Sequence, residues 1–289
     1  MKFELHLKVT TTTTAIQLLS DHCQLSITQL KQAIIKGALW LETAKYTKRF
    51  RRIKKLLNAG DTLHFYYDEQ VLSQQPEPAQ LIADEGEYSL WYKPYGMLSQ
   101  GSKWSDHCTI ARWVEKNLTP ARASFIVHRL DRAASGIILI AHSKKAAKAF
   151  SQLFEQHRLQ KIYYIISHGD HRLRPQPDVI TALIDGKTAH STFTCLAYCP
   201  QQKLSLIEVN IASGRKHQIR KHAAFIGYPV VGDRLHGDKN KPHHKQVNLQ
   251  LCAISLSFIC PLTQKKRSYQ LDNTLIPSLK TVFTVTQAS

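Results

Sequence analysis

A segment at residues 69–85 divides this 289-residue chain into two regions, and this division constrains the fold more than any other feature. Its sequence, EQVLSQQPEPAQLIADE, contains Pro76, Pro78, glutamines and acidic residues, whereas the regions on both sides carry clear apolar patterning. Proline and polar clusters between patterned regions are typical of linkers. The length also accommodates two domains at about 150 residues each. We therefore expect a small domain at residues 1–68, a linker at 69–85 and a larger domain at 86–289.

The charge balance indicates the class of partner. Lys and Arg number 39 against 21 Asp and Glu, which leaves a formal charge of +18 at pH 7 with histidine neutral. Such an excess of one sign opposes compaction by self-repulsion unless a polyanion lies on the surface. We therefore expect nucleic acid as the partner.

The apolar runs are too short for a chain that spans a membrane. Runs such as IILIA at 137–141 and IYYII at 162–166 fall far below the roughly 20 residues that cross a bilayer. Glu4, His6 and Lys8 interrupt the amino-terminal sequence MKFELHLKV, which therefore predicts a strand and not a secretory signal. We expect a cytoplasmic monomer that makes no contact with membranes.

The residue types that bind metals are scattered along the chain. The six Cys residues lack the paired CxxC spacing of a zinc or redox site, and a chain of this length does not need disulfides, so we expect reduced thiols. His236, His243 and His244 lie near lysines, but no fourth ligand follows at a fixed spacing. We favour a basic loop that touches RNA, and we expect no metal site.

The first region predicts a small α/β domain. Thr14 is expected to cap one short helix, and Ser26 or Thr28 is expected to cap a second one. ALWLE at 38–42 and DTLHFYY at 61–67 are typical of strands. Two helices followed by a hairpin are therefore expected.

A strongly basic stretch, KYTKRFRRIKK, joins the two strands of this hairpin. Seven of its eleven residues are basic and none is acidic. Two aromatic residues are interleaved with the cations, a pattern typical of surfaces that bind nucleic acid. A solvated face rich in lysine is the alternative interpretation. We expect phosphate contacts from Lys48, Arg49, Arg51 and Arg52.

The second region predicts a mixed sheet with helices on its faces. Strands are expected at 89–93, 137–141, 161–169, 205–213 and 251–261. Helices are expected at 109–117, after Ser143, and from 215 to about 225. In the last helix, Arg215, Lys216, Arg220 and Lys221 are expected to face away from the buried side. Several strands follow one another without a crossover helix, which favours an α+β fold over a doubly wound one.

HRLDRAASG at 128–136 is the segment with the clearest potential for chemistry. Small residues after Asp131 open onto the strand at 137–141, so this acid lies on a tight loop at the entrance to a strand. Arg129 and Arg132 flank it, and an arginine near a carboxylate lowers the pKa of that carboxylate. An ionised carboxylate can act as a nucleophile or a base, or it can cap the loop. The local sequence leaves these alternatives open.

Together with four other blocks, this segment resembles the RluA-type family of RNA pseudouridine synthases. The other blocks are YKPYGMLS, KIYYIISHG, GRKHQIRKHAAFIGYPVVGDRLHG and LQLCAISLSFICP, in that order. The resemblance covers essentially residues 86–270. Residues 10–68 resemble the small RNA-binding domain named for ribosomal small-subunit protein four, which many members of the family carry. The implied fold is α+β: a catalytic domain with a mixed, mainly antiparallel sheet and flanking helices, plus a small α/β RNA-binding domain.

The resemblance also implies the reaction and its residues. Asp131 would be the catalytic aspartate, which breaks the glycosidic bond of a uridine and lets the base rejoin the ribose through a carbon. Attack on the sugar and removal of a sugar proton both stay open. Tyr163 would stack on the flipped uracil and could assist proton transfer. Arg220 would keep Asp131 ionised, with a plain phosphate contact as the alternative. The other residues expected at the RNA are Arg129, Arg215, Lys216 and His217.

The implied reaction is an isomerisation within one nucleotide, so we expect no cofactor. The expected substrate is structured RNA, ribosomal RNA in the first place and transfer RNA in the second. An inactive RNA-binding or ribosome-assembly factor on the same scaffold is the alternative. Ala134 and Lys216 stand where the family usually has Thr. Neither residue replaces the acid, the tyrosine or the paired arginine, so these departures bear on loop hydrogen bonding and RNA contact.

Overall fold

The computed structural model describes residues 1–237, 247–280 and 282, and the chain divides into two compact units. One unit comprises Met1–Pro76 and Gln100–Asn117, and the other comprises Glu77–Ser99 and Leu118–Ser289. The chain therefore passes from the first unit to the second, returns, and passes again. No helix in the described part of the chain is long and apolar enough to span a membrane.

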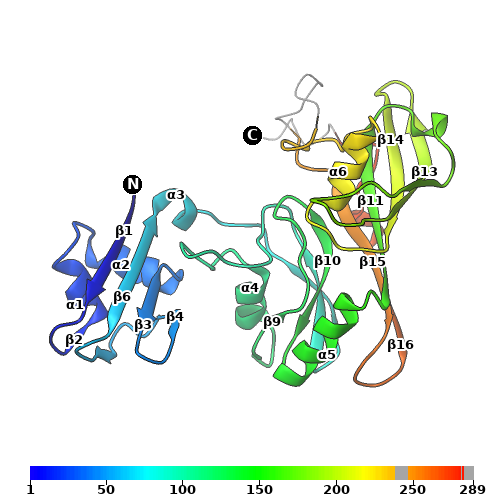
Figure 1. Cartoon of the computed structure of the whole chain (residues 1–289). Coiled ribbons are helices and arrows are strands. Elements are labelled where there is room, and N and C mark those ends of the chain that lie inside the picture. Colours follow the sequence, from blue (N-terminus) through cyan, green and yellow to red (C-terminus); the bar gives the residue numbers. More distant parts are fainter. Residues whose placement is uncertain (238–246, 281, 283–289) are drawn as a thin grey trace. The chain divides into compact units, whose positions relative to one another are not determined.

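The smaller unit contains a four-stranded antiparallel sheet in the order β1-β6-β3-β4 (Figure 1). Its strands are β1 (Lys2–Lys8), β3 (Leu39–Glu42), β4 (Thr47–Arg49) and β6 (Thr62–Asp68). Two short strands, β2 (Thr13–Thr14) and β5 (Leu56–Leu57), pair with each other. The sheet includes the strands that the sequence predicts at the amino terminus, at 38–42 and at 61–67.

Capping residues set the starts of the helices in this unit. Thr14 caps α1 (Ala15–Ser20), and Ser26 caps α2 (Ile27–Ile35) in a capping box with Gln29. Leu19, Leu30 and Ile34 of these helices join the sheet residues Leu39, Leu63 and Phe65 in one buried core. The unit also contains α3 (Glu69–Leu72) and α4 (Ile110–Asn117). Thr14 and Ser26 are the caps that the sequence predicts.

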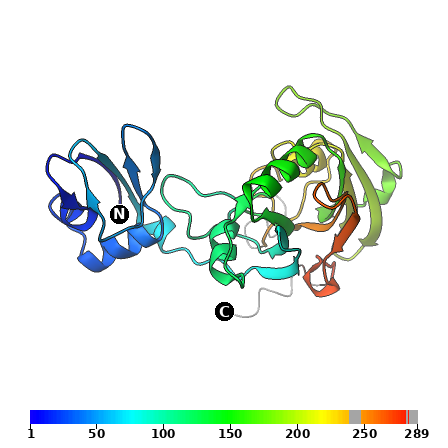
Figure 2. The same cartoon turned by 90° about the horizontal axis from the view of Figure 1, so that it is seen from below.

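The larger unit is built on a ten-stranded sheet (Figures 1 and 2). In chain order the strands are β7 (Gln80–Asp84), β8 (Tyr88–Lys93), β9 (Phe125–Ile126), β10 (Ser135–Ala141), β11 (Leu159–His168), β12 (Asp178–Ile180), β13 (Ser191–Cys199), β14 (Leu204–Ile211), β15 (Leu251–Ile259) and β16 (Lys266–Gln270). Its helices are α5 (Lys144–Glu155) and α6 (Gln218–Phe225), with short 3₁₀ turns η1 (His171–Leu173) and η2 (Asn273–Leu275).

The strand order of this sheet is β12-β13-β14-β11-β15-β10-β8-β7, with β16 beside β15 and β9 beside β10. Only β10 and β15 pair in parallel, and the other pairs in this sheet of the described chain are antiparallel. The fold is therefore α+β with a mixed, mainly antiparallel sheet, as the sequence predicts.

Helix α5 buries its apolar face against this sheet. Ser143 caps it by accepting a hydrogen bond from the Ala146 N–H. Phe150 lies fully buried, with its ring 4.7 Å from that of Tyr88 and 5.7 Å from that of Phe258. Each such aromatic side chain contributes about 1.5–3 kcal/mol by burial. The helix thus fixes the position of β10, which it contacts.

Gly136 permits the parallel pairing of β10 and β15. Its φ is +118°, and a Cβ atom there would lie 2.3 Å from both the N and the O of Ala253. Only glycine tolerates this φ and this approach of two backbones. Because Gly136 follows the loop that carries Asp131 by a few residues, the close pairing also anchors that loop.

The structure corrects the sequence predictions at several places. β12, β13 and β16 occupy residues for which no strand was expected. Helix α3 and strand β7 lie inside the range 69–85, where a linker was expected, and β7 pairs with β8. Helix α6 begins at Gln218 and not at 215, because His217 adopts a left-handed conformation with φ +56° and ψ +27°.

Candidate active site

The loop that carries Asp131 is braced on both sides of the acid by the segment that follows β8. On one side, the Ser99 hydroxyl donates to the Leu130 carbonyl (2.7 Å) and accepts from the Leu130 N–H (3.0 Å). On the other side, the Gly96 N–H donates to the Arg132 carbonyl (2.8 Å). The sequence block YKPYGMLS therefore holds the backbone on which the acid lies.

Lys93 is the deepest part of this brace. Its side chain is fully buried, and its ammonium donates to the carbonyls of Ala134 (2.6 Å), Pro94 (3.0 Å) and Met97 (3.0 Å). Burial lowers the pKa of Lys93 to about 7, while the Asp131 carboxylate acts in the opposite direction. Three carbonyls match the three N–H groups of an ammonium. Lys93 thus ties the end of the loop to β8.

Asp131 and Arg220 meet, although 89 residues separate them. The Arg220 Nη1 donates to the Asp131 Oδ2 at 3.1 Å. The guanidinium is 4% exposed, whereas the carboxylate is 27% exposed. This corrects the prediction that Arg220 faces away from the buried side of its helix. A solute can therefore reach Asp131, whereas Arg220 is shielded from solvent beside it.

Asp233 holds Arg220 from the other side and was not expected from the sequence. It accepts from the Arg220 Nε (2.8 Å) and Nη2 (2.6 Å), and from the N–H groups of Leu235 (3.0 Å) and His236 (3.1 Å). Burial acts to raise the pKa of Asp233, but the hydrogen bonds from Arg220 and from the His236 N–H outweigh it and lower that pKa. Asp233 lies between Gly232 and Gly237 in a block that resembles the family, and this position could have indicated a functional residue.

The charge of Arg220 is secured by both acids. Burial acts to lower its pKa, but hydrogen bonds and attraction from Asp233 and Asp131 raise it above the ordinary value. The side chain therefore remains a guanidinium at any pH at which the protein functions.

Tyr163 lies on β11 at an irregularity of the sheet. The pairing of β11 with β15 shifts register between Ile162 and Tyr163, and such bulges re-aim a side chain next to functional sites. Tyr163 is 9% exposed. Burial raises its pKa, and the nearby Asp131 carboxylate adds to the effect, so the phenol is neutral. Tyr163 is thus within the electrostatic reach of Asp131.

His217 also lies at the acid. Its Nε2 is 3.8 Å from the Asp131 Oδ2, and its Nδ1 forms a 2.9 Å hydrogen bond with the Nε2 of His236. Burial and the nearby Arg220 lower the pKa of His217, while Asp131 acts to raise it. His217, which the sequence predicts at the RNA, is thus part of a cluster with Asp131, Arg220, Asp233 and His236, which we call the Asp131 cluster.

His128 has a structural role although it belongs to the same motif. Its Nε2 accepts the Leu139 N–H (2.9 Å), and its ring stacks on Phe154 at a centroid distance of 4.1 Å. Burial lowers the pKa of His128 to about 3, so the imidazole is neutral. It fixes the loop against β10.

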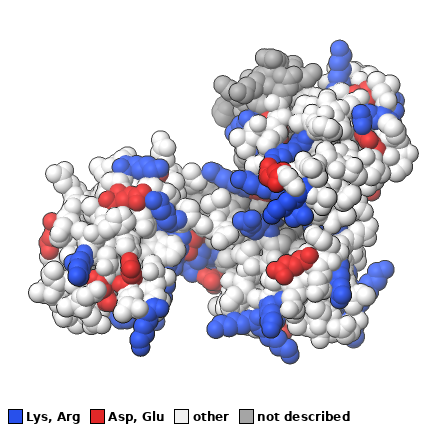
Figure 3. All heavy atoms as spheres, viewed as in Figure 1, with Lys and Arg blue, Asp and Glu red and all other residues white. Residues whose placement is uncertain are grey.

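The other residues expected at the RNA lie within two residues of Asp131 or His217 along the chain. Arg129 is exposed and has no hydrogen bond or ion pair within the described chain. Lys216 is exposed as well, whereas the Arg215 Nε donates to the Thr188 carbonyl at 3.2 Å. Lys and Arg side chains gather on the face of the larger unit that Figure 3 presents. An anionic chain would be attracted to such a face.

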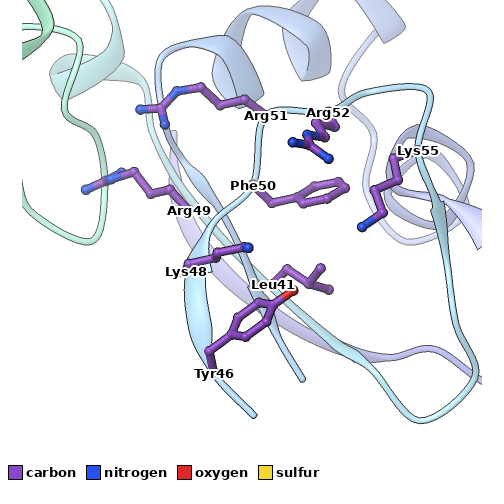
Figure 4. Close-up of a pocket in the computed structure, with 8 residues that line it drawn as sticks. All are labelled: Leu41, Tyr46, Lys48, Arg49, Phe50, Arg51, Arg52 and Lys55. Atoms are coloured by element: carbon purple, nitrogen blue, oxygen red, sulfur yellow. The ribbon is translucent and has the colours of Figure 1, made fainter. Parts of the chain in front are cut away.

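The smaller unit has a basic cavity of its own, with a volume of about 240 Å³. Figure 4 shows that Arg52 and Lys55 point towards it, around Phe50, while Arg49 and Arg51 point away. The Lys48 ammonium lies 4.0 Å above the ring of Tyr46. The lining residues are Leu41, Tyr46, Lys48, Arg49, Phe50, Arg51, Arg52 and Lys55, with no acid among them.

Two of the four residues that were predicted to contact phosphate form ion pairs inside the smaller unit. Arg49 and Arg51 both form ion pairs with Asp106, the former at 3.3 Å. Arg52 and Lys55 are exposed, and their side chains have no polar partner in the part of the chain that the structure describes. Arg52 and Lys55 are therefore cations at the cavity that have no partner among the described residues.

The described residues contain no group of three or more His, Cys, Asp or Glu that could hold a metal ion. His243 and His244 lie outside the described residues, so the prediction of a basic loop there concerns a part that is not described. All six Cys residues are free thiols.

Comparison with known proteins identifies the family. Residues 87–225 match the family described as RNA pseudouridylate synthase. The tRNA pseudouridine synthase C of Vibrio cholerae is 30% identical over 202 residues, which are 60% of this chain and 82% of that protein. Its counterpart in Pectobacterium carotovorum is 35% identical over 136 residues, 39% of this chain and only 36% of that protein. An uncharacterized RNA pseudouridine synthase of Mycoplasma pneumoniae is 25% identical and matches 94% of this chain and 93% of its own length.

Solved structures agree at the level of the fold. The human RNA Pseudouridylate Synthase Domain Containing 1 matches 75% of this chain and 98% of its own, with a TM-score of 0.57 and 19% identity. The human RNA Pseudouridylate Synthase Domain Containing 4 matches 68% and 88%, with a TM-score of 0.55 and 19% identity. With the Vibrio relative matched over most of its length, the chain belongs to the RNA pseudouridylate synthase family and is an RNA pseudouridine synthase, an isomerase.

Proposed function

We propose that the protein isomerises a uridine in a structured RNA to pseudouridine, and that Asp131 is the catalytic carboxylate. The observation that supports this most directly is the ion pair with Arg220, which leaves Asp131 27% exposed while its partner is 4% exposed. A guanidinium beside a carboxylate favours the ionised form. An ionised acid that a ligand can reach is what attack on the sugar or removal of a sugar proton requires.

We assign the neighbouring side chains to the nucleotide that reaches Asp131. A uridine inside a helix cannot be approached by a side chain, so it must leave its stack. The neutral ring of Tyr163 supplies a surface against which the uracil can stack. The exposed Arg129 is placed beside the acid to fill the space that the nucleotide vacates, and Lys216 supplies a phosphate contact.

We propose that residues 1–68 are a small RNA-binding domain, like that of ribosomal small-subunit protein four, and that the basic cavity is its contact with RNA. The lining combines unpaired cations with an apolar floor at Leu41 and Phe50. At about 240 Å³ the cavity is below the roughly 300 Å³ at which pockets for drug-sized ligands begin. A phosphate with part of one nucleotide is a guest of suitable size and charge.

The target class has two candidates. Ribosomal RNA is the expectation from the sequence, and the relatives in Vibrio and Pectobacterium are named for transfer RNA. We propose that one of these structured RNAs is the substrate, and both enter the test.

The experiment measures release of tritium from C5 of labelled uridine in ribosomal and transfer RNA. The wild-type protein should release tritium to water from one of them, and Asp131→Asn should release none while binding that RNA within a few fold of wild type. Asp170→Asn is the matched control, because Asp170 also pairs with an arginine, Arg172, but lies away from the cluster. Wild-type protein that releases no tritium, or Asp131→Asn that retains turnover, contradicts the proposal. An inactive RNA-binding factor predicts the first of these results.

The same preparations test the cavity through the salt dependence of RNA affinity. Replacing Lys48, Arg52 and Lys55 of the lining by Ala should lower the slope of log K against log salt by roughly 2, because each phosphate that the protein neutralises contributes about 0.7–0.9 to that slope. Ala at three exposed lysines of α5 is the control of equal charge. An equal slope in both triple variants would contradict the cavity as the RNA contact. The cavity variant replaces Lys48, Arg52 and Lys55 by Ala, and the control variant replaces Lys144, Lys145 and Lys148 by Ala.

A further inference from the structure

Pseudouridine formation removes a proton from C5 of the uracil and adds one to N1. When C5 of the uracil bonds to the ribose, C5 still carries its original hydrogen. Loss of that hydrogen as a proton lets the electron pair of the C5–H bond form the C5–C6 double bond. N1, which is no longer bound to the ribose, takes up a proton from water, so the isomerisation neither gains nor loses a proton overall. A base within reach of the uracil must therefore accept the proton and pass it to water, in a site that bound RNA covers.

Three side chains near Asp131 are unsuited to this step. Arg220 remains a guanidinium and has no acceptor atom. The Lys93 ammonium uses its three N–H groups on backbone carbonyls and is fully buried. Burial and the Asp131 carboxylate raise the pKa of Tyr163, so its phenol is a poor base.

His217, unlike Arg220, Lys93 and Tyr163, has a ring nitrogen near Asp131 that can accept a proton. Its Nε2 lies 3.8 Å from the Asp131 Oδ2, beyond a direct hydrogen bond, and among the described residues this nitrogen has no hydrogen-bond partner. Its Nδ1 is 2.9 Å from the Nε2 of His236. The backbone of His217 holds φ +56°, a conformation that non-glycine residues adopt at a cost and that clusters at functional sites.

His236 leads from His217 towards the surface. The two rings lie with centroids 5.1 Å apart, and the His236 side chain belongs to a half-buried residue followed by the partly exposed Gly237. The His236 N–H donates to Asp233, which also holds Arg220. One buried acid therefore positions both the partner of Asp131 and the second histidine.

We propose that His217 is a further catalytic residue, the base that accepts the C5 proton, and that His236 passes this proton to water. The inference rests on the proposed role of Asp131. The proton binds Nε2 of His217, the proton on Nδ1 of His217 moves to Nε2 of His236, and the proton on Nδ1 of His236 moves to solvent. After the product leaves, Nε2 of His217 gives its proton to water, Nε2 of His236 returns its proton to Nδ1 of His217, and Nδ1 of His236 takes a proton from water, so both resting tautomers are restored. The step assigns both rings the tautomer with hydrogen on Nδ1 in the resting enzyme.

The charges around His217 suit a transient base. Burial and the cations Arg220 and Lys216 lower its pKa, as does His236, so the imidazole is neutral at pH 7 and free to accept. The Asp131 carboxylate acts to raise the same pKa and stabilises the imidazolium once it forms. A carboxylate stabilises a transient imidazolium in the same way in hydrolytic triads.

The test is His217→Asn, because Asn tolerates the left-handed backbone but cannot relay the proton. At saturating RNA, turnover should fall by roughly 10²–10⁴-fold. The rate ratio between RNA carrying hydrogen and RNA carrying deuterium at C5 should rise, because cleavage of the C5–H bond becomes slower, and added imidazole should restore part of the rate. His157→Asn is the matched control, since His157 has φ +54° but is exposed on the loop after α5.

The outcomes separate this inference from the proposed function. If wild-type protein releases tritium and Asp131→Asn does not, the proposed function stands, whatever His217→Asn does. The relay is then refuted by turnover of His217→Asn within about twofold of wild type, since a catalytic base contributes far more. It is equally refuted by a loss of turnover with an unchanged isotope ratio and no imidazole rescue, or by a loss of RNA affinity alone. His236→Asn should show a smaller loss with the same rise in the isotope ratio.

Discussion

Replacement of Asp233 by Asn tests how the site is held together. Asp233 is 1% exposed and accepts two hydrogen bonds from Arg220, at 2.6 and 2.8 Å. Removing one partner of a buried ion pair costs about 3–5 kcal/mol, because the other charge stays buried. Arg220 keeps Asp131, so we expect the lower end, about 3 kcal/mol, which is roughly a 10²-fold change in the unfolding equilibrium constant.

The assay must report on the larger unit alone. Urea unfolding followed by pulsed hydrogen exchange, read on peptides from β10 and β15, provides this. Asp170→Asn is the matched control, because Asp170 and Arg172 form a pair of the same two-bond geometry, at 2.8 and 2.9 Å, with the arginine 60% exposed. Exposed pairs contribute little to stability, so this variant should unfold close to wild type. A loss in Asp233→Asn below about 1 kcal/mol would refute the reasoning.

The pH dependence supplies a second check on Asp233. Its pKa in the folded protein is lowered, so the folded state binds fewer protons than the unfolded state near the unfolded pKa of about 3.9. The stability that Asp233 contributes is therefore fully present above that pH and is lost as the pH falls through the folded pKa. The difference between wild type and Asp233→Asn should be constant from pH 5 to 7 and shrink in acid below about pH 4.

Two further predictions concern the brace and the strand pairing. Because burial lowers the pKa of Lys93 to about 7, the unfolded state binds more protons between about pH 7 and 10.5. The stability of the larger unit should rise across that window, and Lys93→Met should flatten the rise in urea midpoints. Gly136→Ala should cost at least about 2 kcal/mol through strain and overlap with Ala253, measured by urea unfolding. Gly186→Ala is its control, since Gly186 has φ +74° in open space, and equal losses would contradict the overlap.

The sequence predicts the parts of the fold that depend on neighbours along the chain. The helix starts at Thr14, Ser26 and Ser143 follow from a hydroxyl that accepts a hydrogen bond from an N–H two or three residues later, which a short pattern reveals. The α+β class follows from the order of strands and helices. The position of Asp131 on a loop before β10 follows from the small residues after it. Each of these properties is local.

The contacts that make the site are not local, and the residues alone do not reveal them. Helical periodicity predicts Arg220 on the solvent side, because burial of a cation is costly unless an acid is paired with it. The helix sequence itself does not contain such an acid. Asp233, which makes its burial possible, lies outside the helix. Arg49 and Arg51 are likewise basic residues whose partner, Asp106, comes from a distant segment. Only the resemblance pointed to the pairing of Arg220 with Asp131.

The unequal sharing of Arg220 between its two acids suits the proposed role of Asp131, because that role needs a partner that does not move. Asp233 receives two hydrogen bonds from the guanidinium and two from the backbone, whereas Asp131 receives one at 3.1 Å. In the proposed reaction, a change of charge or bonding at Asp131 leaves Arg220 in place, because the position of Arg220 is set by the buried Asp233. A charge fixed before the reaction lowers the barrier without a cost of reorganisation. Under the proposed mechanism, the more exposed Asp131 reacts while the cation beside it remains fixed.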